Sequence, residues 1–207
     1  MISRCKIQQD AGGKYSKESR QGNEVNREQA LAELKARVKN TNVIKHSLAV
    51  EAIMRKLASF FRDDVEVWGL TGLLHDIDYD RTASDPSMHS IVAADILEGL
   101  WIDKEIIYAV KAHNPIHGIV RKRKLDKALF CADPVSGLIT ASALILPSKK
   151  VADVTVDFIM KKMHNESFAR GASREQIRSC SELGLSLEEF IGIALKAMQE
   201  ISGQLGL

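Results

Sequence analysis

The spacing of apolar residues is the feature that most constrains how this chain can fold. From Asn26 to about Gly203, apolar side chains recur every three or four residues, and few segments alternate with a period of two. A three- to four-residue spacing puts apolar side chains on one face of a helix. The prolines all lie in the middle half of the chain, between residues 86 and 147. We therefore predict an all-α protein built as a helical bundle.

Capping signals set the predicted ends of several helices. Asn26 with Gln29, Ser173 with Gln176, and Ser186 with Glu189 each have the spacing of a capping box. The predicted helices cover residues 26–38, 40–61, 64–75, 89–100, 103–113, 125–146, 149–164, 173–183 and 186–203, and a polar loop follows residue 76.

Proline 134 leaves two interpretations of the helix that begins at Leu125. Either Pro134 kinks this helix, or it opens a new helix with Asp133 as the N-cap. Asn114 precedes Pro115, which disfavours the α-region and ends the preceding helix.

Composition excludes several classes of protein. Hydrophobic residues make up 45% and charged residues 27% of the 207 residues, and the net charge is only +2, which is unlike a nucleic-acid-coating protein. No apolar stretch approaches the roughly 20 residues that cross a bilayer, and the N-terminus lacks the apolar core of a signal peptide.

The three cysteines, Cys5, Cys131 and Cys180, form no CxxC pair, so we expect the protein to reside in a reducing cytoplasm. Residues 1–25 carry no apolar stripe and are predicted to be a flexible leader.

Histidine and aspartate side chains stand where a helical core would bury them. Four of the six histidines lie on or beside apolar stripes, His75 is followed by Asp76 at the end of an apolar run, and Asp133 continues the stripe of Leu125 and Leu129. An unpaired buried carboxylate costs several kcal/mol. Taken singly, a hydrogen-bonded core histidine or an N-cap aspartate explains each residue. Taken together, they would satisfy one another around a metal ion.

The order of these residues resembles the HD-domain superfamily of metal-dependent phosphohydrolases. The matching residues are His46 in VIKHSLAV, His75 and Asp76 in LTGLLHDIDYD, and Asp133 in KALFCADPVSG. His89 in MHSIVAADIL and His113 in VKAHN match the two extra histidines of two-metal members. The resemblance covers residues 40–145 and implies one HD-type helical domain over 26–207, with a metal-binding core at 40–145 and a C-terminal helical extension at 149–207.

Two departures from the family patterns limit what the resemblance implies. Many members read HDIGK where this chain reads HDIDY, so Asp78 replaces the glycine and the lysine is absent. His113 is followed by Asn114 and Pro115, unlike the Gly-Tyr-Pro motif of members that cleave cyclic dinucleotides.

The resemblance implies one or two divalent metal ions. His46, His75, Asp76 and Asp133 would bind the first ion, and Asp76 could bridge to a second ion held by His89 and His113. Imidazole and carboxylate ligands suit Mn, Fe, Co, Ni or Mg. A bound ion lowers the pKa of water to roughly 7, which would allow hydrolysis of a phosphate ester, such as that of a nucleotide.

Further candidates for substrate binding and proton transfer are charged residues that would ordinarily lie on the surface. Lys45, Arg81, Lys149 and Lys150 are candidate phosphate contacts. Asp80 is the preferred proton donor among Asp78, Asp80 and Asp85, although turn-forming surface aspartates are the ordinary explanation for all three. The basic run at 121–124 is interpreted as a solvated loop. In SFARGASREQI, which carries Arg170 and Arg174, Ser173 is interpreted as a helix cap, with anion binding at that helix start as the lesser alternative.

Three alternative functions remain open at this stage. A di-iron oxygenase could use the same ligands, a sensor could keep the metal without turnover, and an interaction protein could bury the histidines without metal. For partners, we expect a small phosphorylated substrate, no nucleic-acid duplex and no membrane, with a homodimer as the base-rate expectation.

Overall fold

The described part of the chain, residues 25–207 of a computed structural model, is helical and contains no strand within this range. In chain order the α-helices are α1 Arg27–Arg37, α2 Thr41–Phe61, α3 Val65–Leu74, α4 Tyr79–Thr82, α5 Ile91–Gly99, α6 Lys104–His113, α7 Lys124–Leu144, α8 Val156–Met163, α9 Arg174–Arg178, α10 Leu187–Glu200 and α11 Ser202–Leu205. The 3₁₀ helices are η1 Pro115–His117, η2 Val151–Asp153 and η3 Ser179–Leu183. The all-α prediction is confirmed. The predicted leader lies outside the described residues, apart from Val25.

Side-chain caps fix the helix starts where the sequence predicts them. Asn26 Oδ1 accepts a hydrogen bond from Gln29 N at 2.9 Å, and Gln29 Oε1 accepts one from Asn26 N at 3.0 Å. Ser186 and Glu189 form the same reciprocal box at α10. Each box satisfies backbone donors that the first turn of a helix leaves without a partner.

The predicted elements differ from the structure in several places. The single helices predicted over 173–183 and 186–203 are each divided, the first into α9 and η3 and the second into α10 and α11. The helix through Pro134 is continuous, so Asp133 is not an N-cap, and the interpretation of a new helix starting there is wrong. The loop after His75 contains the short helix α4. The segment predicted as one helix over 149–164 is divided into η2 and α8, because Thr155 caps α8 by accepting from Phe158 N at 3.2 Å.

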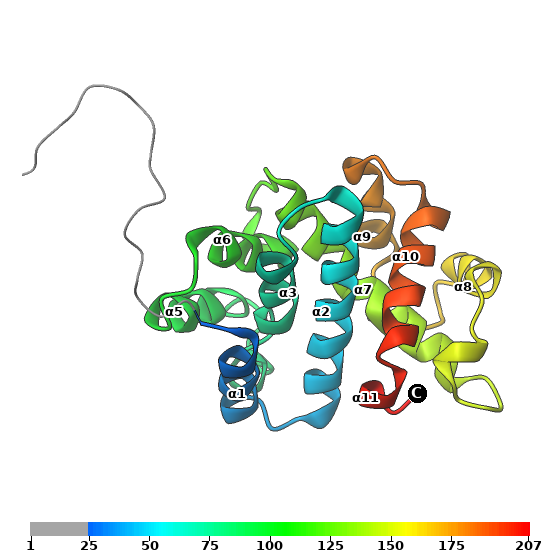
Figure 1. Cartoon of the computed structure of the whole chain (residues 1–207), viewed down its shortest axis with the longest axis horizontal. Coiled ribbons are helices and arrows are strands. Elements are labelled where there is room, and N and C mark those ends of the chain that lie inside the picture. Colours follow the sequence, from blue (N-terminus) through cyan, green and yellow to red (C-terminus); the bar gives the residue numbers. More distant parts are fainter. Residues whose placement is uncertain (1–24) are drawn as a thin grey trace, which may run out of the picture.

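Helix α2 separates two groups of helices (Figure 1). Helices α1, α3, α5 and α6 enclose one apolar cluster, centred on buried residues such as Leu73 and Val110. The second cluster joins α2 to α7, α8 and α10 and includes Ile53, Leu138 and Phe190. The chain therefore has two neighbouring apolar cores, and α2 forms part of the wall between them.

Helices α2 and α3 approach closely at Gly72. A Cβ atom at this position would lie 2.8 Å from the carbonyl oxygen of Val50 and 2.9 Å from Glu51 Cα. Beside this contact the buried Glu51 carboxylate accepts hydrogen bonds from Arg27 Nε at 2.6 Å and Arg55 Nε at 2.9 Å. Two guanidinium groups therefore neutralise the one carboxylate that this close packing buries.

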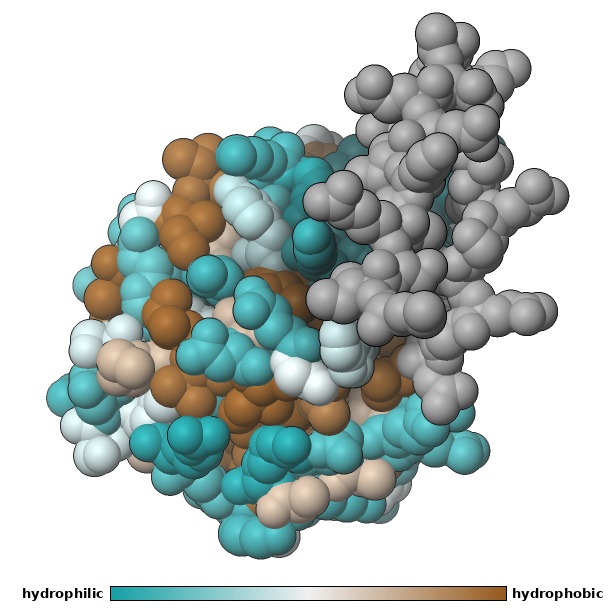
Figure 2. Space-filling model, turned by 90° about the vertical axis from the view of Figure 1, so that its left-hand side faces the viewer, coloured by the Kyte–Doolittle hydropathy of each residue, from teal (hydrophilic) through white to brown (hydrophobic). Residues whose placement is uncertain are grey.

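The surface mixes polar and apolar side chains. On the face turned to the viewer in Figure 2, hydrophobic and hydrophilic groups interleave. Trp101, which follows α5 with a φ of 59°, is 90% exposed, whereas Trp68 is buried. Among the described helices, none has the length and apolar character needed to span a membrane.

The close approach of α2 and α3 predicts a large effect of a single methyl group. Gly72→Ala should lower the free energy of unfolding by about 1–3 kcal/mol. The added methyl group would meet backbone atoms of α2, which cannot move aside as the end of a flexible side chain can. The matched control is Gly192→Ala in α10, where the nearest atom to an added Cβ is 3.9 Å away. The control should gain about 0.5–1 kcal/mol from helix propensity. Urea unfolding followed by circular dichroism measures both, and equal stabilities for the two variants would contradict this packing.

Candidate metal centre

The six predicted metal ligands come from five segments of the chain and meet at one place. His46 lies on α2, His75 and Asp76 follow α3, and His89 lies just before α5. His113 is the last residue of α6, and Asp133 lies within α7. Helix ends supply most of the donors, so the cluster sits where the two groups of helices adjoin.

The predicted first set of ligands is within contact distance. His46 Nε2 lies 3.2 Å from His75 Nε2, 3.1 Å from Asp133 Oδ1 and 3.6 Å from Asp76 Oδ2. His75 Nε2 lies 3.5 Å from Asp76 Oδ1. Donors in neighbouring positions about one octahedral ion, each at about 2.1 Å, are about 3 Å apart. These distances therefore suit one shared ion.

The predicted second set adjoins the first through Asp76. His89 Nε2 lies 3.2 Å from His113 Nε2, and Asp76 Oδ1 lies 3.4 Å from His89 Nε2 and 3.9 Å from His113 Nε2. Three overlapping triads have donor atoms that all lie within 4.8 Å of one another: His46, His75 and Asp76; His75, His113 and Asp133; and Asp76, His89 and His113. Asp76 therefore has the central position that a bridging carboxylate needs.

Each of the four histidines is held through its other ring nitrogen. His75 Nδ1 donates to Gly72 O at 2.8 Å, and His113 Nδ1 donates to Val110 O at 2.5 Å. His46 Nδ1 lies 2.9 Å from Ser136 Oγ, whose own hydroxyl donates to Asp133 O. His89 Nδ1 lies 2.9 Å from Asp78 Oδ1. These acceptors place the proton of each neutral ring on Nδ1 and leave a lone pair on Nε2.

Lone pairs therefore face one another inside the cluster. The Nε2 atoms of His46 and His75 are 3.2 Å apart, and so are those of His89 and His113. Two acceptors at this distance repel unless a positive charge lies between them, either a proton on one ring or a metal ion. A divalent ion would satisfy both rings and the adjoining carboxylates together, so the donor set fits a metal site.

The electrostatic environment differs among the ligands. Burial opposes the charged form of His46, but the hydrogen bond and charge of Asp133, together with Asp76, outweigh it and raise the His46 pKa. Burial and the charge of His75 lower the pKa of His113 to about 4. Burial also opposes ionisation of Asp133, but His46 and the other histidines lower its pKa well below the usual range. These shifts favour a charged carboxylate at Asp133 and a neutral imidazole at His113, which are the forms that bind a metal ion, whereas the raised pKa of His46 favours a proton that an ion would have to displace.

Asp78 supports the segment that carries His89, and the sequence prediction missed this arrangement. It is buried, whereas a surface turn was the ordinary expectation. Besides His89, its carboxylate accepts hydrogen bonds from Ser90 N at 2.8 Å and Ala93 N at 3.0 Å. Ser90 has a φ of 68°, a backbone conformation that needs such support outside glycine. Asp78 thus holds both the ring of His89 and the backbone that carries it.

A second group of contacts fixes the His89 segment from the other side. His117 Nε2 donates to the carbonyl oxygen of His89 at 2.8 Å, and Asn114 Nδ2 donates to it at 3.2 Å. Asn114 also donates to Pro86 O at 3.3 Å. The departure from Gly-Tyr-Pro after His113 therefore has a structural role, because Asn114 ties the end of α6 to the His89 segment.

The other predicted site residues are not brought into these contacts. Lys45 is exposed and its Nζ lies beside Gly206, while Arg81 is exposed on α4. Asp80 is also exposed, and its Oδ2 accepts a hydrogen bond from Lys39 N at 2.6 Å. Their roles as substrate contacts and proton donor stay predictions.

Lys149 and Lys150 follow the far end of α7. Asp133 lies about three turns, or roughly 16 Å, before Leu144, which ends that helix. Both lysines are exposed there. Their predicted contact with a phosphate at the cluster also remains untested.

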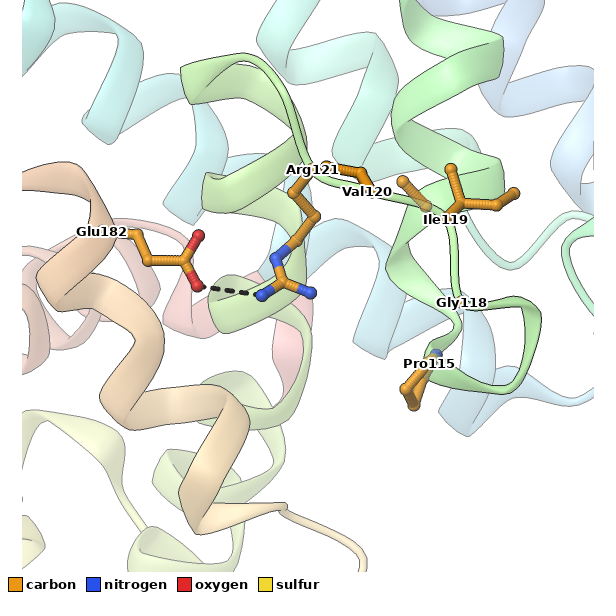
Figure 3. A pocket seen from close by; sticks show the side chains of 7 residues that line it. Pro115, Gly118, Ile119, Val120, Arg121 and Glu182 are labelled. Atoms are coloured by element: carbon orange, nitrogen blue, oxygen red, sulfur yellow. Dashed lines mark hydrogen bonds and ion pairs between the residues drawn. The ribbon is translucent and has the colours of Figure 1, made fainter.

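The basic run at 121–124 is more than a solvated loop. Arg121 pairs with Glu182 at 2.9 Å and lies 3.8 Å above the Phe130 ring, and Arg123 contacts Glu105 and Asp126. Lys124 Nζ lies 4.9 Å above the Phe61 ring. Arg121 and Glu182 border a cavity of about 390 Å³, where their charges meet (Figure 3). That pairing leaves this cavity without a free cation for an anionic ligand.

The cysteines take no part in the cluster. Cys131 and Cys180 are buried free thiols, and Cys5 lies outside the described residues. Burial, with the neighbouring Cys180, raises the pKa of Cys131 well above its usual value. Cys131 is therefore the inert buried thiol expected from the sequence.

Comparison with protein families identifies the fold that carries these ligands. Residues 43–135 match the family model of the HD domain, and this segment contains all six predicted ligands. The chain carries an HD domain. HD domains belong to a superfamily of metal-dependent hydrolases, and the matched segment lies within the predicted core at 40–145.

Two curated relatives agree with this assignment. Ribonuclease Y of Desulfotalea psychrophila is 31% identical over 96 residues, which are 46% of this chain and 18% of that protein. An uncharacterized protein of Methanocaldococcus jannaschii, MJ0778, is 36% identical over 107 residues, or 49% of this chain and 61% of the relative. The matched part of this chain thus covers less than two thirds of the length of either relative. No solved structure matches it.

The support of His89 by Asp78 predicts a selective loss of metal affinity. Asp78→Asn should weaken binding of the second of two Mn²⁺ ions about 10- to 100-fold, because the amide is a poorer acceptor for His89 Nδ1 and the Ser90 amide. Asp95→Asn, an exposed carboxylate on α5, is the matched control. Isothermal titration calorimetry measures both affinities. Equal binding by Asp78→Asn and the parent would show that the outer carboxylate does not tune the site.

Proposed function

We propose that this HD-domain protein is a phosphohydrolase that cleaves a phosphate ester of a small molecule, such as a nucleotide, with water. The observation that carries the proposal is the meeting of four imidazole Nε2 lone pairs with the carboxylates of Asp76 and Asp133. The acceptors on each Nδ1 and the distances between the donors both support divalent ions as their partner.

In this proposal His46, His75, Asp76 and Asp133 would hold one ion. His89 and His113 would hold a second ion together with Asp76. When bound, the ions would supply Lewis acidity toward phosphoryl oxygens and lower the pKa of water. The mixture of imidazole and carboxylate ligands suits Mn, Fe, Co, Ni or Mg.

The exposure of the ligands indicates how a substrate would reach the cluster. The side chains of His75 and His113 are almost fully buried, whereas those of His46, His89 and Asp133 are 25%, 21% and 29% exposed. A substrate would therefore approach from the side on which these three ligands are exposed. Gly72 O and Val110 O hold the buried rings from behind and fix their orientation before any substrate arrives.

The named relative is compatible with this class of reaction. A ribonuclease cleaves phosphodiester bonds of RNA, so its substrate is also a phosphate ester. Because the similarity covers 18% of that protein, it supports the chemistry of the domain and leaves the substrate to experiment.

The decisive experiment measures metal content and phosphate release together. Protein stripped with a chelator is reloaded with Mn, Co, Ni, Fe or Mg, its metal is counted by mass spectrometry, and a panel of phosphate monoesters, diesters and nucleotides is screened. The test variant is His75→Ala with Asp76→Ala, and His164→Ala, an exposed histidine outside the cluster, is the matched control. We expect metal-dependent release that falls at least about 100-fold in the double variant and stays unchanged in the control.

Other results would favour the alternative functions. Two irons with oxygen-dependent turnover and no phosphate release would point to the oxygenase. Firm metal binding without any turnover would favour a sensor. Absence of metal under every condition, with the double variant as stable as the parent, would overturn the metal site itself.

A further inference from the structure

A cavity of about 290 Å³ opens beside the exposed edge of the metal cluster. One wall carries His46 of α2 with Asp133, Pro134 and Gly137 of α7. The opposite wall is the segment 169–172, which lies just before α9. The C-terminal part of the chain, outside the matched HD segment, therefore supplies a wall of the cavity next to two proposed metal ligands.

Arg170 is the one lysine or arginine among the residues that line this cavity. It is exposed, and no ion pair or hydrogen bond to it is present within residues 25–207. This distinguishes it from Arg121 and Arg123, whose charges are taken up by Glu182, Glu105 and Asp126. A guanidinium group without a carboxylate partner keeps its donors available for an anion in the cavity.

The segment that carries Arg170 is held by one buried side chain. Arg174, which is only 8% exposed, donates through its guanidinium to the carbonyl oxygens of five residues: Lys162, Asn165, Phe168, Ala169 and Ala172. The distances range from 2.5 to 3.3 Å. These carbonyls extend from the last turn of α8 to the residues on both sides of Arg170, so one buried cation binds the backbone of this whole segment.

The turn also contains a strained residue. Ala169 has a φ of 47°, a left-handed conformation that is unfavourable for a residue with a Cβ atom. Such a conformation persists where the surroundings enforce it. The bonds from Arg174 Nη1 to Ala169 O and Ala172 O flank Arg170 on both sides and provide that enforcement.

The facing wall leaves room for a ligand. Gly137 lies one turn beyond Asp133 on α7, and no atom outside its own helix lies within 4 Å of where its Cβ would be. A volume of about 290 Å³ is at the small end of the range of ligand pockets, which suits a phosphoryl group with a compact leaving group.

We propose that Arg170 binds phosphoryl oxygens of the substrate across this cavity and that Arg174 is a positioning residue that presents Arg170. The inference rests on the proposed function, because the cavity is a substrate site only if the neighbouring cluster holds metal. In this proposal the phosphate contact is made by Arg170, which lines the cavity beside the cluster, instead of by Lys149 and Lys150, which lie beyond the end of α7. A planar guanidinium presents a rigid pair of donors that matches two phosphoryl oxygens, and a lysine ammonium lacks this geometry.

The first test compares Arg170→Gln and Arg170→Lys with the parent. Inorganic phosphate is titrated into Mn-loaded protein by calorimetry, and kcat/KM is measured on an ester that the parent hydrolyses. We expect Arg170→Gln to weaken phosphate binding and lower kcat/KM about 10- to 100-fold at unchanged metal content, with partial recovery in Arg170→Lys. Arg178→Gln, the same change on an exposed arginine of α9, is the matched control.

The positioning role of Arg174 is tested by a double-mutant cycle. Arg174→Lys should weaken phosphate binding in the parent background and have little further effect in the Arg170→Gln background, because it acts through Arg170. A purely structural role would give the same loss in both backgrounds. Melting temperature and metal content are recorded for every variant, so that unfolding is separated from loss of presentation.

The outcomes separate this inference from the proposed function. Phosphate release by the parent, together with unchanged binding and kcat/KM in Arg170→Gln, would overturn the inference and leave the phosphohydrolase intact. A loss confined to the double variant Lys149→Gln with Lys150→Gln would also overturn it. If the parent releases no phosphate, the proposed function fails, and phosphate binding that is equal in parent and Arg170→Gln would then overturn the inference independently.

Discussion

The orientation of four imidazole rings by their Nδ1 atoms is the constraint on which the metal cluster depends. Two of these bonds are local. His75 and His113 each stand at the end of a helix and donate to the carbonyl oxygen three residues earlier. The other two are tertiary, because His46 needs Ser136 of α7 and His89 needs Asp78. The cluster therefore forms only when α2, α7 and the segment before α5 are packed together.

The predictions from sequence were most accurate where structure is encoded locally. Capping boxes placed the starts of α1 and α10, and the helical stripes brought out the histidines and aspartates that face inward. The family match confirms the HD domain that the order of those residues indicated. Whether the six residues bind metal remains a proposal that their geometry supports.

The predictions were weakest where long-range packing decides. Asp78 has the composition of a turn, and only its burial against Ser90 and Ala93 reveals its role. One signal was present, since Asp78 stands at the position of the glycine in HDIGK and directly follows a buried run. For the segment 169–172 the sequence offered only anion binding at the start of the following helix, as a lesser alternative, because the segment reaches the cluster through the turn of the chain around Arg174.

Because the cluster lies between two apolar cores, binding of an ion there would be coupled to folding. Asp76 and His113 belong to the side of α3 and α6, whereas Asp133 belongs to α7 and the other core. An ion held by both sides acts as a cross-link, and its binding free energy adds to the stability of the folded chain. The supply of metal would then govern the lifetime of the protein as well as its chemistry, since a chelator would loosen the two halves from each other.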